Sequence, residues 1–157
     1  MIIHASILSA KRIAAKLPAL VLLLLIGCDA SAQVIETSIE EGVEQVYLRY
    51  PSGDLGVTGW LFTDPDGGTP RPLLVFNHGG VGGVGNGTKQ LCRTLVGQGF
   101  TVFAPSYRGE DDSEGEIEVA VGEVDDAVNA IAFLEDHDKV DPERVLLAGT
   151  SHGALVS

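Results

Sequence analysis

Our expectation for the fold starts from nine residues, Val145-Leu146-Leu147-Ala148-Gly149-Thr150-Ser151-His152-Gly153. The first four form a short apolar run typical of a buried strand, and the last five form a G-x-S-x-G motif. A serine hydroxyl is a weak nucleophile until a base takes its proton, and this motif presents the serine on a tight turn between a strand and a helix. Such a turn has almost no room for side chains, which explains the two glycines. Ser151 is therefore the predicted nucleophile.

Two upstream segments, Leu73–Phe76 and Thr101–Ala104, resemble the run at Val145–Ala148. All three are short and nearly continuously apolar, which is typical of parallel strands buried on both faces. Amphipathic helical patterns lie between them at Lys89–Gln98 and Glu123–Glu135. Strand, helix, strand, helix, strand predicts an α/β fold with a mostly parallel sheet and helices on both faces. The apolar residues of the two helical patterns are Leu91, Cys92, Leu95, Val96, Val124, Ala127, Val128, Ile131 and Leu134.

Before this α/β part we expect a hairpin of two strands, Val46–Tyr50 and Val57–Phe62. The turn-forming residues Pro51–Asp54 separate them. Residues 28–42 are expected to form a short polar tether, and residues 43–157 the folded domain.

The segment Asn77-His78-Gly79-Gly80 follows the first apolar strand, at the edge where an open α/β sheet binds its ligands. Acyl transfer develops an oxyanion, and catalysis needs N–H donors aimed at it. One donor is the backbone of the residue after the nucleophile, here His152, and the other comes from the loop after an earlier strand. Gly79 or Gly80 is the predicted second donor, because glycine lets the backbone approach the substrate closely.

Two nucleotide motifs nearly match the same loop and are rejected. Residues 80–85 fit G-x-G-x-x-G, but the next strand ends in Ala104–Ser106 without an acid to hold a ribose. Residues 82–87 have the spacing of a P-loop, but Thr88-Lys89 reverses the required order of lysine and hydroxyl residue.

The acidic stretch Glu110–Glu116 is interpreted as a solvated loop. Aligned as an EF-hand on Gly115, it would place Val121 where a bidentate glutamate is needed. We therefore predict neither a metal site nor an organic cofactor.

The ordered set of motifs resembles the prolyl-oligopeptidase and dienelactone-hydrolase branch of the α/β-hydrolases. It comprises Asn77–Gly80, Tyr107-Arg108-Gly109, the helix Glu123–Glu135 and Val140–Arg144 leading into the serine motif, and it covers about residues 43–157. The resemblance implies a serine hydrolase that cleaves small-molecule esters or peptides through an acyl-enzyme.

By that resemblance Ser151 is the nucleophile, His152 and Gly79 or Gly80 lend oxyanion donors, and Tyr107-Arg108-Gly109 shapes the site. In this family the triad acid and histidine follow the serine in chain order, whereas only four residues follow Gly153. A complete domain takes roughly 200 to 250 residues. We therefore expect the N-terminal part of such a domain, truncated after the serine turn and inactive by itself.

None of the four histidines has the position of the family's base. They are His4, His78, His137 and His152. His137 is expected at the surface near a helix C-terminus. The alternative function is a non-catalytic binding or scaffold protein that retains the half-fold.

The N-terminus reads as a targeting segment, because basic residues precede an apolar stretch at Leu17–Ile26 that is too short to span a bilayer. Leu25-Ile26-Gly27-Cys28 resembles a bacterial lipobox, so residues 1–27 would be a signal peptide and Cys28 would carry lipid. The alternative is cleavage after Ala30-Ser31-Ala32, which would release a soluble secreted or periplasmic protein. We favour the lipid-anchored protein of the cell envelope, facing the periplasm.

The net charge of the mature chain argues against negatively charged partners. Removing residues 1–27 leaves 7 basic and 22 acidic residues, a net charge of −15, which disfavours binding to nucleic acid or to anionic headgroups.

With Cys28 lipidated or lost by cleavage, Cys92 has no disulfide partner and is expected to be a core residue on a helix. Because a sheet that stops at the serine motif leaves a strand edge unpaired, we expect the isolated chain to be soluble only as an oligomer or a chaperone complex, or not at all.

Overall fold

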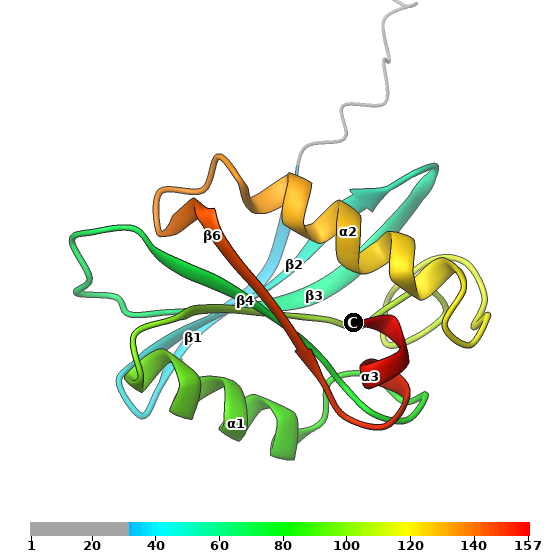
Figure 1. Ribbon diagram of the computed structural model, residues 1–157, viewed down its shortest axis with the longest axis horizontal. Helices are drawn as coiled ribbons and strands as arrows, with labels where there is room; N and C mark the ends of the chain where they lie inside the picture. Colours follow the sequence, from blue (N-terminus) through cyan, green and yellow to red (C-terminus); the bar gives the residue numbers. More distant parts are fainter. Residues whose placement is uncertain (1–31) are drawn as a thin grey trace, which may run out of the picture.

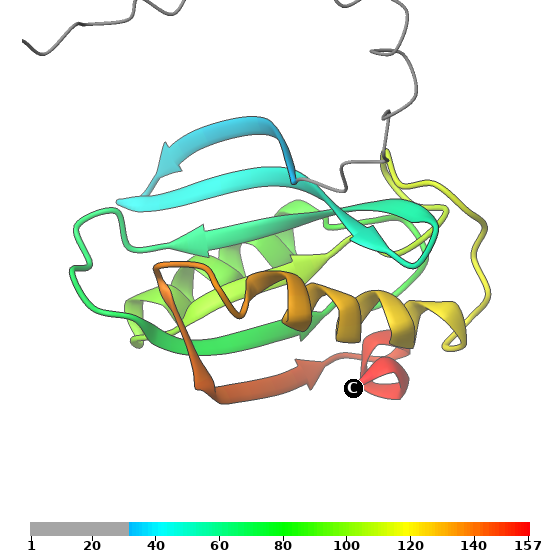
Figure 2. The same ribbon diagram turned by 90° about the horizontal axis from the view of Figure 1, so that it is seen from above.

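The computed structural model describes residues 32–157 as a six-stranded sheet covered by helices (Figure 1). The strand order is β1-β2-β3-β5-β4-β6, with β1 and β6 at the two edges (Figure 2). The elements are β1 (Gln33–Glu40), β2 (Val43–Ser52), β3 (Leu55–Thr63), β4 (Arg71–Asn77), α1 (Asn86–Gly97), β5 (Thr101–Pro105), α2 (Gly122–Leu134), β6 (Val140–Gly149) and α3 (His152–Val156).

The parallel part of the sheet consists of β5, β4 and β6, as the βαβ pattern predicted. The hairpin is confirmed as well: β2 pairs antiparallel with β3, and β3 pairs antiparallel with β5. The sheet is therefore mixed, with an antiparallel half and a parallel half joined between β3 and β5.

Residues 33–40 form strand β1, paired antiparallel with β2, where we expected a polar tether. The side chains of this edge strand are mostly exposed, including the apolar Val34, Ile35 and Ile39. Pairing with the long neighbouring strand, and β-branched residues along it, favour extended structure even without burial.

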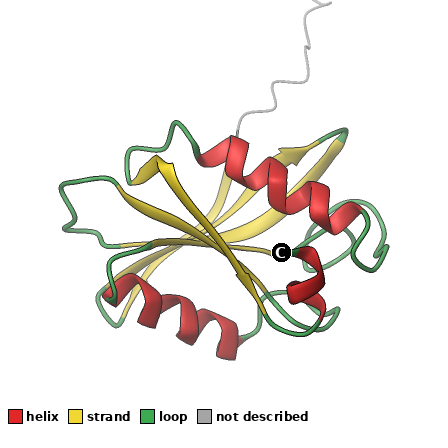
Figure 3. Ribbon diagram, in the orientation of Figure 1, coloured by secondary structure: helices red, strands yellow, loops and turns green. Residues whose placement is uncertain are grey.

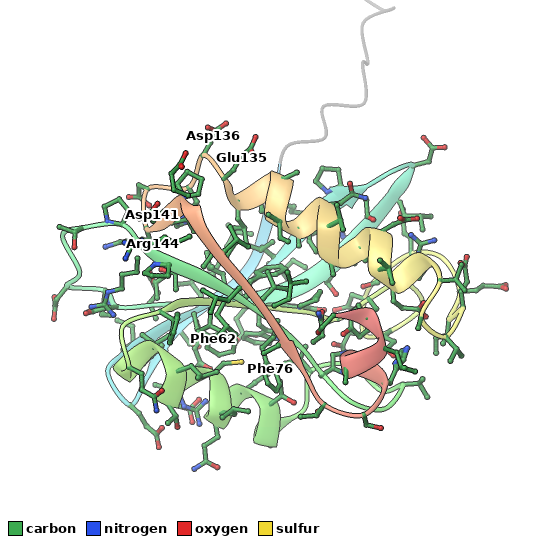
Figure 4. The ribbon with its side chains drawn as sticks, viewed as in Figure 1. Phe62, Phe76, Glu135, Asp136, Asp141 and Arg144 are labelled. Carbon is green, nitrogen blue, oxygen red and sulfur yellow. The ribbon has the colours of Figure 1, made fainter. Side chains whose placement is uncertain are left out.

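The two faces of the sheet are covered by different helices, because successive residues of a strand point to opposite faces. Leu74 and Phe76 pack with Cys92 of α1, while Leu73 and Val75 pack with Leu134 of α2. Figure 4 shows Phe62 and Phe76 on the α1 side of the sheet. Cys92 is fully buried, as expected of a core residue.

Several predicted core positions are exposed instead. Leu146 and Leu147 of β6 are partly open to solvent, because in the described structure β6 lies at the sheet edge and pairs only with β4. Val128 of α2 is also exposed, since the buried residues of that helix are centred on Ala127, Ala130 and Leu134. The expectation of burial was wrong at these positions.

The predicted signal peptide, residues 1–27, and the predicted lipidation site Cys28 lie outside the described residues. Within residues 32–157, no helix is long and apolar enough to cross a membrane, and no cluster of three or more possible ligand residues is suited to hold a metal ion.

Candidate active site

Ser151 occupies a sharp turn between β6 and α3, with φ 51° and ψ −116°. A positive φ is unfavourable for a residue with a side chain, and such strained residues gather at functional sites. Ser151 is exposed to solvent. The strand, turn and helix that the G-x-S-x-G motif requires are therefore all present.

Both glycines of the motif are required by space. A Cβ atom at Gly149 would lie 2.2 Å from the carbonyl oxygen of Gly153, and one at Gly153 would lie 2.0 Å from that of Asn77. Neither position admits a side chain without movement of the backbone, as expected of a tight turn.

The loop after β4 lies against this turn, since Asn77 pairs with Gly149 at the ends of adjacent parallel strands. A Cβ atom at Gly79 would contact the Thr150 carbonyl oxygen at 3.0 Å and Ser151 Cβ at 3.3 Å. Gly80 has φ 83°, and its carbonyl oxygen lies 2.9 Å from His152 Nδ1. The structure thus brings Ser151, Gly79, Gly80 and His152 together at one end of the sheet.

Tyr107 contacts both the loop after β4 and the serine turn. It is buried with φ 54°, and its hydroxyl donates to Asn77 Oδ1 at 3.1 Å. Its ring is close to the rings of both His78 and His152, with centroid distances of 4.6 Å and 5.8 Å. Burial, with nearby carboxylates, raises the pKa of Tyr107 well above its ordinary value, so the hydroxyl remains a neutral donor.

Arg108 ties the loop after β5 to helix α2. Its guanidinium pairs with the buried carboxylate of Asp126 at 2.9 Å, and its backbone N–H donates to Asp126 Oδ2 at 2.8 Å. Asp126 also accepts from the Ser52 hydroxyl at 2.6 Å. The hydrogen bonds to Asp126 raise the pKa of Arg108.

Glu110 is a site residue that sequence reasoning missed. We assigned it to a solvated loop, but it is buried, and its Oε2 accepts a hydrogen bond from the Gly83 N–H at 2.8 Å. The same oxygen lies 3.1 Å from His78 Nε2. The signal that indicates burial is position: Glu110 follows Tyr107-Arg108-Gly109 just after β5, whose end lies beside the end of β4.

Within the described residues, no hydrogen-bond partner of the Ser151 hydroxyl and no adjacent base are present. His78 faces Glu110, and His152 Nδ1 faces Gly80. His137 follows α2, where its Nδ1 accepts from the Lys139 N–H, and the Lys139 carbonyl accepts from Arg71 at the start of β4.

His137 is half-exposed near the C-terminus of α2, as expected. Since β4 rises about 20 Å from its first to its last residue, His137 lies at the end of the sheet remote from Ser151. It therefore has no access to the serine.

The family model of the X-Pro dipeptidyl-peptidases (S15 family) matches residues 14–157. The chain belongs to this family. The uncharacterized peptidase YtmA of Bacillus subtilis (strain 168) is 33% identical over 109 residues, which cover 69% of this chain and 42% of YtmA. The match thus spans less than half the length of that relative.

Solved structures show the same fold. An esterase from an Arctic intertidal metagenomic library superposes with a TM-score of 0.64 at 17% identity, over 77% of this chain and 56% of the esterase. A dienelactone hydrolase-like phosphotriesterase from metagenomic libraries superposes with a TM-score of 0.57 at 19% identity, over 69% of this chain and 49% of that enzyme. The expected resemblance to the α/β-hydrolases is confirmed, and the chain belongs to a family of hydrolases.

Proposed function

We propose that Ser151 is the nucleophile of a serine hydrolase that cleaves esters or peptides through an acyl-enzyme. The observation that carries the proposal is the strained turn at Ser151, with φ 51°, directly beside Gly79 of the loop after β4. Strain of this kind persists only where the surrounding structure holds it. The strained turn exposes the serine side chain at the carboxyl ends of the parallel strands, where open α/β sheets bind their ligands.

The chemistry proposed is acyl transfer in two steps. Ser151 Oγ attacks the carbonyl carbon of the substrate, its proton passes to a base, and the carbonyl oxygen becomes an oxyanion. Collapse of this intermediate breaks the bond to the leaving alcohol or amine, which takes up the proton. Water then hydrolyses the ester on Ser151 and restores the hydroxyl.

The oxyanion would be stabilised by two backbone N–H groups. His152 is the first residue of α3, and Gly79 lies against Thr150 and Ser151 of the turn. Loss of one such donor typically costs about 10²–10³-fold in kcat. Proximity supports this role, since a Cβ atom at Gly79 would lie only 3.3 Å from Ser151 Cβ, a tighter contact than is usual.

The base is the element that residues 32–157 do not supply next to Ser151. We propose that it comes from sequence other than these residues, and that a protein ending at Ser157 shows no burst of acyl-enzyme. Normal turnover by such a protein would contradict this account of the triad.

The test uses the full product of the gene that carries this chain. It is incubated with a fluorophosphonate probe, and hydrolysis of an activated acetate ester and of an X-Pro anilide is followed. We expect labelling at Ser151 and loss of labelling and turnover in Ser151→Ala, while the better substrate separates esterase from peptidase activity. Unchanged turnover of Ser151→Ala would remove Ser151 from the role of nucleophile.

The second candidate is a non-catalytic binding or scaffold protein. It is favoured by one observation, the lack of a base beside Ser151 in the described residues. A full gene product that neither reacts with the probe nor hydrolyses either substrate, yet unfolds in a single cooperative transition, would support it.

We propose further that the protein is exported and lipid-anchored through Cys28, on the basis of the apolar stretch that ends in Leu25-Ile26-Gly27-Cys28. Intact-mass analysis of the mature protein should show a lipidated Cys28 at its N-terminus. An unmodified N-terminus at Gln33 would instead indicate the alternative cleavage site.

A further inference from the structure

Carboxylates that follow β5 hold the loop after β4 at both of its ends. We call residues 78–85 the glycine loop and residues 110–116 the acidic loop. Glu110 Oε2 accepts from the Gly83 N–H at 2.8 Å and lies 3.1 Å from His78 Nε2, so one carboxylate contacts the beginning and the end of the glycine loop. Asp111 Oδ2 accepts from the next N–H, that of Val84, at 3.2 Å.

The contact between Glu110 and His78 is fully buried, since each side chain is only 1% exposed. Removing polar side chains from water is costly, and a buried polar pair often adds no more stability than apolar residues of the same volume. Moreover, Glu110 Oε1 and His78 Nε2 are buried without a well-aligned hydrogen bond. A contribution to overall stability therefore explains this pair poorly.

The backbones of both loops are also constrained where they meet. In the glycine loop, Gly80 and Gly83 have φ 83° and 76°, and in the facing segment Tyr107 and Asp111 have φ 54° and 46°. Asp111 Oδ1 lies only 2.2 Å from the place that a Cβ atom of Gly83 would occupy. The two loops are thus in close contact at Gly83, the residue whose N–H donates to Glu110.

We propose that Glu110 is a positioning residue that fixes the orientation of the Gly79 and Gly80 N–H groups toward Ser151. It does so by holding His78 on one side of these glycines and Gly83 on the other. The inference rests on the proposed function, because the orientation of these amides matters only where an oxyanion develops. Oxyanion donors act over a narrow range of distance, about 2.7–3.1 Å, so a small shift of the glycine loop weakens them.

The test compares Glu110→Ala and Glu110→Gln with Glu116→Ala in the full gene product. Glu116 is an exposed carboxylate of the same acidic loop. For the activated ester we expect kcat to fall about tenfold or more in Glu110→Ala with little change in KM, because the lost interaction acts in the transition state. The kcat of Glu110→Gln should fall less, since its amide oxygen can still accept from the Gly83 N–H. The kcat of Glu116→Ala should match that of the parent.

A second measurement does not depend on activity. Hydrogen–deuterium exchange of residues 79–84 should become faster in Glu110→Ala and stay unchanged in Glu116→Ala. If the parent protein does not react at Ser151, the proposed function fails, while the exchange comparison still decides whether Glu110 holds the loop. Should Glu110→Ala fail to fold, Glu110→Gln replaces it. A kcat per labelled serine equal to that of Glu116→Ala, together with unchanged exchange, would overturn the proposal.

Discussion

At the carboxyl ends of β4, β5 and β6, non-glycine residues adopt positive φ angles at Tyr107, Asp111 and Ser151, whereas at the opposite end of these strands no described non-glycine residue does. The first end also buries ionic groups, among them Glu110 and Asp126. At the opposite end the ionic contacts are more open, as between Asp141 and Arg144, which Figure 4 shows at the start of β6. The loops of both ends are seen in Figure 3, with α3 at the strained one.

The two ends of the sheet thus differ in how much unfavourable structure they contain. Strained backbone and buried charge cost free energy and persist only where neighbouring contacts enforce them. Along the parallel strands β4, β5 and β6, both occur at the end that carries the proposed nucleophile; at the other end of the sheet the one described non-glycine residue with a positive φ is Glu41, in the turn between β1 and β2. Substitutions of the same kind at the two ends should therefore have very different effects.

The largest difference in stability between the two ends is expected for substitutions of glycine by alanine. In Gly153→Ala the new Cβ would meet the Asn77 carbonyl oxygen, so the backbone of the serine turn must move, and we expect the free energy of unfolding to fall by about 4 kcal/mol. The control is Gly68→Ala in the loop before β4, where a Cβ meets nothing within 4 Å. Denaturant unfolding of both variants measures the contrast, and similar losses would refute it.

The need for glycine in the serine turn was predictable from sequence, because the G-x-S-x-G motif specifies a local backbone. The buried strands and both long helices were predictable for a similar reason, since their apolar periodicity reports burial directly. Glu110 was not predictable in this way. Its burial results from contacts with His78 and Gly83, which come from another strand end and leave no periodic pattern around Glu110 itself.

The same distinction explains the errors at the sheet edges. Apolar periodicity indicates that a segment forms a strand but not where the strand lies in the sheet, so the exposure of Leu146 and Leu147 was missed. Strand β1 was missed for the converse reason: its neighbour β2, rather than burial, defines it.

The next largest difference in stability is expected between alanine variants of two arginines, one at each end. Arg108→Ala leaves the carboxylate of Asp126, which is 0% exposed, without its guanidinium partner, and we expect a loss of about 3 kcal/mol in unfolding free energy. Arg144→Ala removes an ion pair in which the arginine side chain is 57% exposed, and should cause no measurable change, as is usual for surface pairs. Thermal unfolding at pH 7 compares them. Equal stability of the two variants would mean that the Arg108 pair is as weakly coupled as a surface pair.

The smallest difference concerns two glutamates at the two ends of α2. Glu123, at the strained end, accepts hydrogen bonds from the backbone N–H groups of Glu118, Val119 and Val121 at 2.8 to 3.1 Å. Burial alone would raise the pKa of Glu123, but these hydrogen bonds outweigh it and lower the pKa below the ordinary value. Glu135, at the other end, is exposed, and Figure 4 shows it pointing outward.

A lowered pKa in the folded state means that the ionised Glu123 stabilises the fold, and that this stabilisation is complete above the pKa of the unfolded chain. As the pH falls below about 4.3, the ordinary value for glutamate, and then through the lower folded value, the contribution is lost. Glu123→Gln should therefore be less stable than the parent at pH 7, and the gap should close progressively with acidification. Glu135→Gln, at an exposed position, is the control and should be as stable as the parent at pH 7. Urea unfolding at a series of pH values measures both, and a gap for Glu123→Gln that stays constant from pH 7 to pH 3 would show that the hydrogen bonds to the 118–121 backbone do not depend on the charge of this carboxylate.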